Sequence, residues 1–271
     1  SFPEAFSKRL FEPGHPFGSG FPGLHIKTFS FVFCAIPGYA IAAYSSSQLF
    51  CLKGFLILKL KISNLKSVLP PNSMKKIVIV GGGFGGIYTA HYLLKHLKNT
   101  KIILVNKTDY FLFTPLLHEV ATGSQQRHNI IVEIREFLQH KNFEFHMGEI
   151  KHIDFNEKLI NLNNAKITYD SLIIAIGSKP NFYSIKGAEK YATPLKNLND
   201  AIMIRKKIIS SLKEASSVSK EKRKSYTNFV IVGGGPTGVE LAGELSEFIK
   251  EIITKYEKLS LSDIKIFLVQ R

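Results

Sequence analysis

Residues 77–86 read IVIVGGGFGG, and this stretch decides the fold. Its first four residues are apolar and β-branched, which predicts a short buried strand. The glycines that follow open a helical pattern, because apolar residues recur every three or four positions over 87–97. A second apolar run at 102–105 predicts the next strand. Strand, glycine-rich turn, helix and strand make a complete βαβ unit, the context in which a glycine motif indicates dinucleotide binding.

The glycines of this turn stand at Gly-x-Gly-x-x-Gly spacing, and three of them have separate tasks. Gly81 permits the tight turn, Gly83 lets the backbone approach a pyrophosphate, and Gly86 lets the helix pack closely on the strand. The helix then begins with free N–H groups and the positive end of its dipole, both of which favour phosphate. A glycine-rich turn without a ligand is the weaker interpretation, because such a turn needs neither this spacing nor two flanking strands.

Asn106 stands about twenty positions after the third glycine, where an acidic side chain usually accepts hydrogen bonds from ribose hydroxyls. Asparagine can still accept one hydrogen bond, but it lacks the charge. We therefore expect a ribose contact that is weaker or shared with a neighbour.

The same arrangement occurs a second time at 229–238, which reads FVIVGGGPTG. Gly233, Gly235 and Gly238 repeat the spacing, and Pro236 is tolerated in the first helical turn because an N–H there has no intrahelical partner. A helical pattern and a further apolar run complete the second unit. A protein with two such phosphate cradles usually holds one cofactor permanently and exchanges electrons with a second that comes and goes.

The second ribose position is occupied by Gln270, with Arg271 directly after it. Glutamine, like asparagine, offers no charge to the ribose. Because an arginine at this place can accept a 2′-phosphate, the sequence leaves the choice between NADH and NADPH open.

The chain between the two cradles predicts further parts of an α/β fold. Short runs between 153 and 169 alternate with turn residues and predict an antiparallel meander. The fully apolar run at 172–176 predicts a central strand of a parallel sheet. A helical stripe follows at 194–215, with Asn197 or Asn199 as its N-cap. The predicted fold class is α/β, with tandem Rossmann-like dinucleotide-binding domains.

Composition narrows the chemistry. Lys and Arg number 36 against 21 Asp and Glu, and the net charge of +15 favours an anionic partner such as a dinucleotide or a phospholipid surface. Nucleic acid is disfavoured, because no base-reading motif accompanies the charge. Cys34 and Cys51 both precede the first cradle, so no thiol from residue 74 onward can serve as a nucleophile or redox partner, which argues against disulfide reductases.

No metal site is predicted. Five histidines lack metal-ligand spacing, and we expect them at the surface or satisfied in the core. They are His118, His128, His140, His146 and His152.

Residues 1–73 differ from the rest of the chain. The apolar run at 29–50 is interrupted by Pro37 and followed by no clean cleavage site, so it fits poorly as a spanning helix or a signal sequence. Met74 is the first methionine and looks like a start. We predict that 1–73 is an extension outside the fold; a membrane anchor and a targeting segment are the alternatives.

Residues 74–271 resemble the N-terminal part of type II NADH:quinone oxidoreductases. The segment DYFLFTPLLHEVATG at 109–123 is more telling than the glycine motifs, which the wider flavin reductase superfamily shares. The other matching stretches are 76–86, 175–178 and 233–245.

The resemblance implies an NADH-binding domain inserted into an FAD-binding domain, with 74–185 as the first part of the FAD domain and 186–271 as the first part of the NAD(P)H domain. It implies transfer of a hydride from NADH to flavin and of electrons onward to a membrane quinone. It also implies a respiratory, non-proton-pumping enzyme at the cytoplasmic face of the cell (inner) membrane, held there peripherally, with a homodimer left open.

The resemblance further implies site residues. Thr114 and Pro115 would lie beside the flavin ring, and Glu240 near the nicotinamide would be the catalytic candidate, unless this carboxylate only favours the positive end of its helix. The cofactor-binding candidates are Gly81, Gly83, Phe84, Gly85, Gly86, Asn106, Lys107, Thr114, Pro115, Ala175, Gly177, Gly233, Gly235, Pro236, Thr237, Gly238 and Gln270.

The sequence departs from the family pattern in three places. Asn106 and Gln270 replace acids, and Ala-Ile-Gly stands at 175–177 in place of Ala-Thr-Gly. The chain also stops at Arg271, before the expected quinone site, so we expect this stretch alone not to reduce quinone. The alternatives are another FAD/NAD(P)H reductase, such as a ferredoxin-type reductase, and a non-catalytic dinucleotide-binding fragment.

Overall fold

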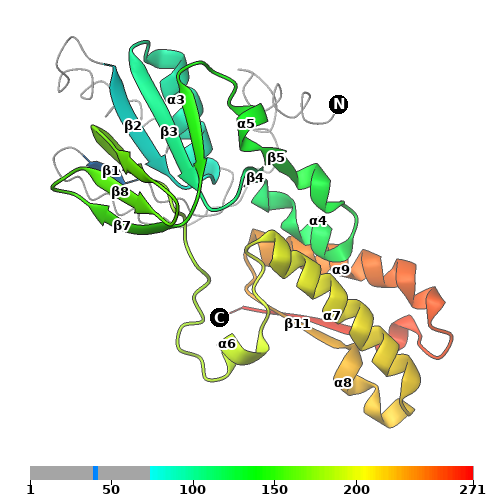
Figure 1. Cartoon of the computed structure of the whole chain (residues 1–271). Coiled ribbons are helices and arrows are strands. Elements are labelled where there is room, and N and C mark those ends of the chain that lie inside the picture. The colour runs from blue at the N-terminus through cyan, green and yellow to red at the C-terminus, as the bar shows by residue number, and fades with distance from the viewer. Residues whose placement is uncertain (1–38, 42–73, 271) are drawn as a thin grey trace, which may run out of the picture. The chain divides into compact units, whose positions relative to one another are not determined.

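The computed structural model describes residues 39–41 and 74–270 (Figure 1). The chain forms two compact units. Among the described residues, the first unit comprises 39–41, 74–111 and 132–178, and the second comprises 112–131 and 179–270. Residues 112–131, which the sequence analysis places in the first domain, therefore cluster with the second unit.

A five-stranded parallel sheet forms the centre of the first unit. Its strand order is β1-β10-β2-β3-β6, and every neighbouring pair runs parallel. The strands are β1 (Tyr39–Ile41), β2 (Lys75–Val80), β3 (Thr100–Asn106), β6 (Phe143–Met147) and β10 (Ser171–Ile174). The prediction that the apolar run at 172–176 is a central strand is confirmed, because β10 lies between β1 and β2.

The two faces of this sheet are covered differently. Alternate residues of β2 point to opposite faces, as in any strand. Val78 and Val80 belong to a core cluster with the three-stranded antiparallel sheet of β7 (Ile150–Asp154), β8 (Leu159–Leu162) and β9 (Lys166–Thr168). Ile79 instead lies against Gly86 of helix α3 (Phe84–His96). The predicted βαβ unit and the predicted meander are both confirmed.

Strand β1 comes from the stretch predicted to lie outside the fold. Tyr39–Ile41 pairs with Leu172–Ile174 at the edge of the sheet. The predictions for the rest of 1–73 fall on residues outside the described part of the chain.

The second unit contains a parallel pair of strands with helices packed on it. The pair is β11 (Asn228–Val232) and β12 (Lys265–Val269), and the main helices are α4 (Leu117–Thr122), α7 (Leu198–Ser217) and α9 (Pro236–Ile252). Leu212 of α7 and Ile249 of α9 are buried in one core cluster, against which Phe229 and Ile231 of β11 pack. The second strand, turn and helix motif is therefore confirmed as a βαβ-type unit.

Helix α7 begins at a capping box that settles one prediction. The Asn197 side chain accepts a hydrogen bond from the Asp200 N–H at 3.0 Å, and the Asp200 carboxylate accepts one from the Asn197 N–H, also at 3.0 Å. Asn197 is thus the N-cap, and Asn199 lies inside the helix. Two orphan N–H groups are satisfied reciprocally.

Shorter elements complete the described chain. They are β4 (Tyr110–Leu112), β5 (Ile131–Glu133), α5 (Ile134–Phe137), α6 (Ala188–Tyr191), α8 (Lys224–Thr227), η1 (Thr114–Leu116), η2 (Arg127–Ile130), η3 (Lys220–Lys222), η4 (Ile253–Lys255) and η5 (Leu261–Asp263). Across 39–41 and 74–270, none of the helices combines the length and apolar character needed to cross a membrane.

Candidate functional site

The first cradle is a backbone turn that only glycine can form at two of its positions. Gly81 has φ +107°, and a Cβ there would overlap the carbonyl oxygen of Ala175. A Cβ on Gly86 would overlap the carbonyl oxygen of Gly81. The Gly81 N–H donates to the Val105 carbonyl at 2.8 Å, which ties the turn to β3. The tight turn and the close helix packing expected of these two glycines are present.

Gly83 has the opposite surroundings. No atom of the described residues lies within 4 Å of where its Cβ would stand. It is the N-cap of α3, and no side chain in the described chain caps this helix start. Open space over an uncapped helix N-terminus is the geometry that a pyrophosphate needs. Gly85 and Phe84 follow in the first turn, and the Phe84 ring packs edge-on against Phe111 with centroids 5.0 Å apart.

Asn106 braces this cradle from the end of β3. Its Oδ1 accepts the Gly82 N–H at 2.9 Å, while its Nδ2 donates to the carbonyl and the hydroxyl of Thr108 at 3.0 and 3.1 Å. Both polar atoms of the side chain therefore contact the protein. The prediction that Asn106 shares its ribose contact gains a physical reason here, because only the second lone pair of Oδ1 remains for a ligand.

Lys107, the next candidate, belongs to a surface ion network. Its Nζ lies 3.0 Å from Glu149 Oε1, and Lys151 Nζ lies 2.9 Å from Glu149 Oε2. Hydrogen bonds from Lys151 and then from Lys107 lower the pKa of Glu149 to about 2. Nothing in the sequence spacing of Glu149 links it to Lys107, so this contact is visible only in the structure.

The second cradle repeats the first. Gly233 has φ +115°, and a Cβ on Gly238 would overlap the Gly233 carbonyl oxygen. Around Gly235, in the part of the chain that the structure describes, no atom comes within 4 Å of the Cβ position. Gln270 Oε1 accepts the Gly234 N–H at 2.6 Å, as Asn106 accepts that of Gly82. Pro236 and Thr237 form the first turn of α9 and are exposed.

The remaining candidates lie at the ends of strands and helices. Ala175 and Gly177 follow β10, where Ala175 packs on the Gly81 turn and Gly177 has φ +71°. Thr114 and Pro115 form the start of η1 in the second unit and are half-buried. Within 39–41 and 74–270, no group of three or more potential metal ligands gathers at one place.

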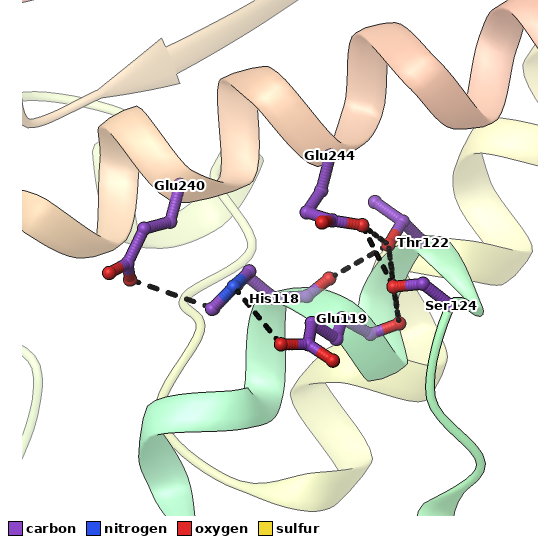
Figure 2. Close-up of polar contacts among 6 residues, drawn as sticks. All are labelled: His118, Glu119, Thr122, Ser124, Glu240 and Glu244. Carbon is purple, nitrogen blue, oxygen red and sulfur yellow. Dashed lines mark hydrogen bonds and ion pairs between the residues drawn. The ribbon is translucent and has the colours of Figure 1, made fainter. Parts of the chain in front are cut away.

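Glu240 and His118 face each other in the second unit. Glu240 stands in the second turn of α9 with a half-exposed side chain, and its Oε2 lies 3.7 Å from His118 Nδ1 (Figure 2). His118 is 9% exposed, and its Nε2 lies 3.9 Å from Glu119 Oε1. Its Nδ1 has no hydrogen-bond partner among the described residues. The expectation of a surface or satisfied core histidine is therefore wrong for His118.

A second contact joins the same two helices. The Ser124 hydroxyl donates to Glu244 Oε2 at 2.8 Å, and the Thr122 hydroxyl lies 3.4 Å from the same oxygen (Figure 2). Glu244 was also missed by the sequence analysis. Its only available signal was its spacing of four from Glu240, which places both carboxylates on one face of α9.

Comparison with known proteins gives three consistent findings. The sequence profile described as "Pyridine nucleotide-disulphide oxidoreductase" matches residues 75–261. The external alternative NAD(P)H-ubiquinone oxidoreductase B4, mitochondrial, of Arabidopsis thaliana is 35% identical over 68% of this chain and 34% of its own. The external alternative NADH-ubiquinone oxidoreductase, mitochondrial, of Yarrowia lipolytica is 31% identical over 77% of this chain and 38% of its own.

A solved structure agrees. NDH2 from Plasmodium falciparum in complex with NADH superimposes with a TM-score of 0.65 at 36% identity, over 72% of this chain and 41% of that one. The resemblance to type II NADH dehydrogenases and the predicted α/β dinucleotide fold are confirmed. The chain spans between a third and a half of the length of the relatives it matches.

Proposed function

Because the chain belongs to the pyridine nucleotide-disulphide oxidoreductase family, we propose that it is part of an FAD-dependent NADH:quinone oxidoreductase. The observation that carries the proposal is the repetition of one cradle. Both turns combine a left-handed first glycine, an open second position and a third glycine packed on the first. A bound dinucleotide at each place would be held by backbone N–H groups and a helix N-terminus.

The disulphide chemistry in the family description is not part of this proposal. Both cysteines, Cys34 and Cys51, lie before the stretch that the family profile matches. A chain without a thiol in 75–261 has no redox disulfide there. Within 75–261, therefore, no thiol would accept electrons from the first cradle.

At the first cradle we propose FAD, which supplies a two-electron acceptor when bound. Gly81, Gly83 and Gly86 would hold its pyrophosphate, and Asn106 would keep the turn in shape through Gly82. We also propose contacts with FAD from five further residues in or next to this cradle. They are Phe84, Gly85, Lys107, Ala175 and Gly177. Thr114 and Pro115 remain candidates through the family resemblance.

At the second cradle we propose a nicotinamide dinucleotide, with Gly233, Gly235 and Gly238 at its pyrophosphate. The relatives are named for NADH in one case and NAD(P)H in the other. Gln270 places no negative charge at the ribose position, which favours tolerance of a 2′-phosphate. We therefore propose NADH as a substrate, with NADPH as a second one to be tested.

We propose a membrane quinone as the acceptor, because the relatives are named ubiquinone oxidoreductases. Their names also say mitochondrial, which favours a mitochondrial membrane over the cell membrane expected from the sequence. The net charge of +15 supports peripheral attachment to anionic lipid. A homodimer remains a prediction.

One feature favours the second candidate, a non-catalytic dinucleotide-binding fragment. Val230 and Val232 of β11 and Phe267 and Val269 of β12 are 60%, 77%, 45% and 49% exposed. Parallel sheets are normally covered on both faces, and exposed apolar patches usually mark surfaces that something else covers. In this candidate the cradles hold dinucleotide without passing electrons to quinone.

The test is a visible spectrum of the protein expressed from the whole open reading frame that contains these residues. We expect a yellow flavin spectrum that NADH bleaches and a soluble quinone analogue restores. Absence of flavin, or flavin that NADH does not bleach, would favour the non-catalytic fragment. Running the same reaction with NADPH decides the nucleotide preference.

A further inference from the structure

His118 is a buried polar side chain whose arrangement the fold alone does not explain. A buried ring nitrogen without a hydrogen bond costs free energy, and such groups are uncommon in folded proteins. Nδ1 of His118 is one of them, and it faces the Glu240 carboxylate at 3.7 Å. That separation is longer than a hydrogen bond but within reach of an ion pair. A small rotation of either side chain would close it.

The two helices are held so that this pair stays aligned. On α9, Glu240 and Glu244 are one turn apart, and on α4, His118 and Thr122 are one turn apart. The contact of Glu244 with Ser124 at 2.8 Å is closed, whereas that of Glu240 with His118 is open (Figure 2). The hydrogen bond between Ser124 and Glu244 joins the C-terminal end of α4 to α9, and it therefore limits how far the His118 imidazole can move away from Glu240.

Helix α7 holds the other end of α4. Helix α4 ends at Thr122, and its C-cap Gly123 has φ +90°. The Arg205 guanidinium occupies the place where a Cβ on Gly123 would stand. Arg205 also lies over the Phe248 ring, 5.1 Å from its centroid. Arg205 thus ties the C-terminal end of α4, a helix of only six residues, to α7.

The charged groups around the imidazole come from all three helices. Glu119 lies on α4 itself, Glu240 and Glu244 on α9, and Arg205 on α7. Glu244 is engaged by Ser124, and Arg205 is directed at Gly123. The carboxylates nearest the two ring nitrogens are Glu240 and Glu119, so a positive charge on His118 would be neutralised by them.

We propose that His118 is a positioning residue that sets the charge and orientation of Glu240. When the imidazole is protonated it closes an ion pair with Glu240 and cancels its negative charge. When the imidazole is neutral the contact stays open and Glu240 presents a free carboxylate. Histidine is the side chain suited to this, because it changes charge in the physiological pH range.

The consequence for a ligand rests on the proposed function, in which Glu240 lies near the nicotinamide. The oxidised nicotinamide ring carries a positive charge and the reduced ring is neutral. A free carboxylate beside the ring favours the oxidised form, and a neutralised one does not. Preference for NAD⁺ over NADH should therefore be weaker with a protonated imidazole beside Glu240 than with a neutral one.

The experiment measures the dissociation constants of NAD⁺ and NADH by calorimetry, on the protein from the whole open reading frame, between about pH 5.5 and about pH 8.5. We expect the ratio of the two constants to change about threefold in favour of NAD⁺ over this range, as for a partly exposed charge pair. In His118→Gln, which retains a polar amide but cannot titrate, the ratio should be flat. His128→Gln, an exposed histidine on the same unit, should behave like the wild type.

A pH dependence that survives in His118→Gln would overturn the inference, as would a flat ratio in the wild type. If neither nucleotide binds, the proposed function fails instead, and the pairing is then decided on the ligand-free protein. There, a double-mutant cycle of His118→Gln and Glu240→Gln should give non-additive shifts in Tm at about pH 5.5 and additive ones at about pH 8.5. Additive shifts at both pH values would refute the pair itself.

Discussion

The side-chain oxygen of Gln270 accepts the backbone N–H of Gly234 at 2.6 Å, and that of Asn106 accepts the N–H of Gly82 at 2.9 Å. The two cradles thus share a brace as well as a glycine spacing. In each cradle, an uncharged side-chain amide at the end of the next strand accepts a hydrogen bond from the glycine directly after the turn's first glycine, which is Gly82 in the first cradle and Gly234 in the second. A carboxylate could accept the same bond and would add a negative charge at the ribose.

Gln270→Glu tests the consequence at the second cradle. The carboxylate should keep the bond to Gly234 and repel a 2′-phosphate, so kcat/KM with NADPH should fall by about tenfold relative to NADH, or about 1.4 kcal/mol. Gln270→Leu removes the bond without adding charge and serves as the control. Equal ratios in the wild type and in Gln270→Glu would show that this position does not select the nucleotide.

Gly83→Asp separates binding from folding at the first cradle. Gly83 has φ −82° and ψ −169°, an extended conformation open to any residue, and its Cβ position is clear among the described atoms. The variant should fold, but its carboxylate should repel a pyrophosphate. We expect protein of normal circular dichroism that purifies without flavin, whereas Gly83→Ala, which narrows the same space without adding charge, should retain more flavin than Gly83→Asp. Yellow Gly83→Asp protein would remove FAD from this cradle.

Gly235→Asp makes the matching change at the second cradle. Its φ of −74° and ψ of 175° are equally permissive. The variant should remain yellow, because the first cradle is unchanged, but NADH should no longer bleach the flavin at concentrations that saturate the wild type. Normal bleaching would place NADH elsewhere.

Gly86→Ala should destabilise the first unit. The added methyl group would overlap the Gly81 carbonyl oxygen, a backbone atom that cannot swing away. Overpacking of this kind costs about 1–3 kcal/mol, which a lower Tm of the flavin-free protein would report. Gly85→Ala is the control, since its Cβ would make only an ordinary 3.6 Å contact with Ala175. An unchanged Tm in Gly86→Ala would mean that α3 can shift away from β2.

Glu149 gives a prediction about pH. Lys151 and Lys107 depress its pKa to about 2 in the folded chain, so its stabilising contribution is complete above the ordinary glutamate range and is lost as the pH falls toward about 2. The Glu149 side chain is half-exposed and its ion pairs lie at the surface, so we expect a small effect on stability. Carboxyl NMR should show the depressed titration, and Lys151→Gln should move it upward. Titration at the ordinary glutamate pKa would show that the network does not form in solution.

Much of the fold follows from local pattern. The β-branched runs at 77–80 and 102–105 and the glycine spacing between them predict β2, α3 and β3, because periodicity and turn chemistry act over a few residues. For the N-terminus of α7, the sequence predicts an asparagine N-cap but does not decide which asparagine it is. Asn197 and Asn199 both suit an N-cap, and only the position of Asp200 relative to Asn197 decides between them.

The contacts within the candidate site join residues far apart in the sequence, so no local sequence pattern predicts them. The segment 109–123 is visible as a family motif in the sequence, yet the packing of its helix α4 (Leu117–Thr122) on α9 is not. His118 and Glu240, like Ser124 and Glu244, are separated by about half the chain.

By itself, then, the sequence determined two phosphate cradles, the α/β class and the family, because strands, glycine turns and helix starts are set by neighbouring residues. Only the tertiary structure decided that Asn106 and Gln270 brace the cradles and that His118 is buried facing Glu240. Those relationships depend on which helices and strands pack together. That packing is set by burial of apolar surface summed over many residues, so it leaves no signal at the polar positions it brings into contact.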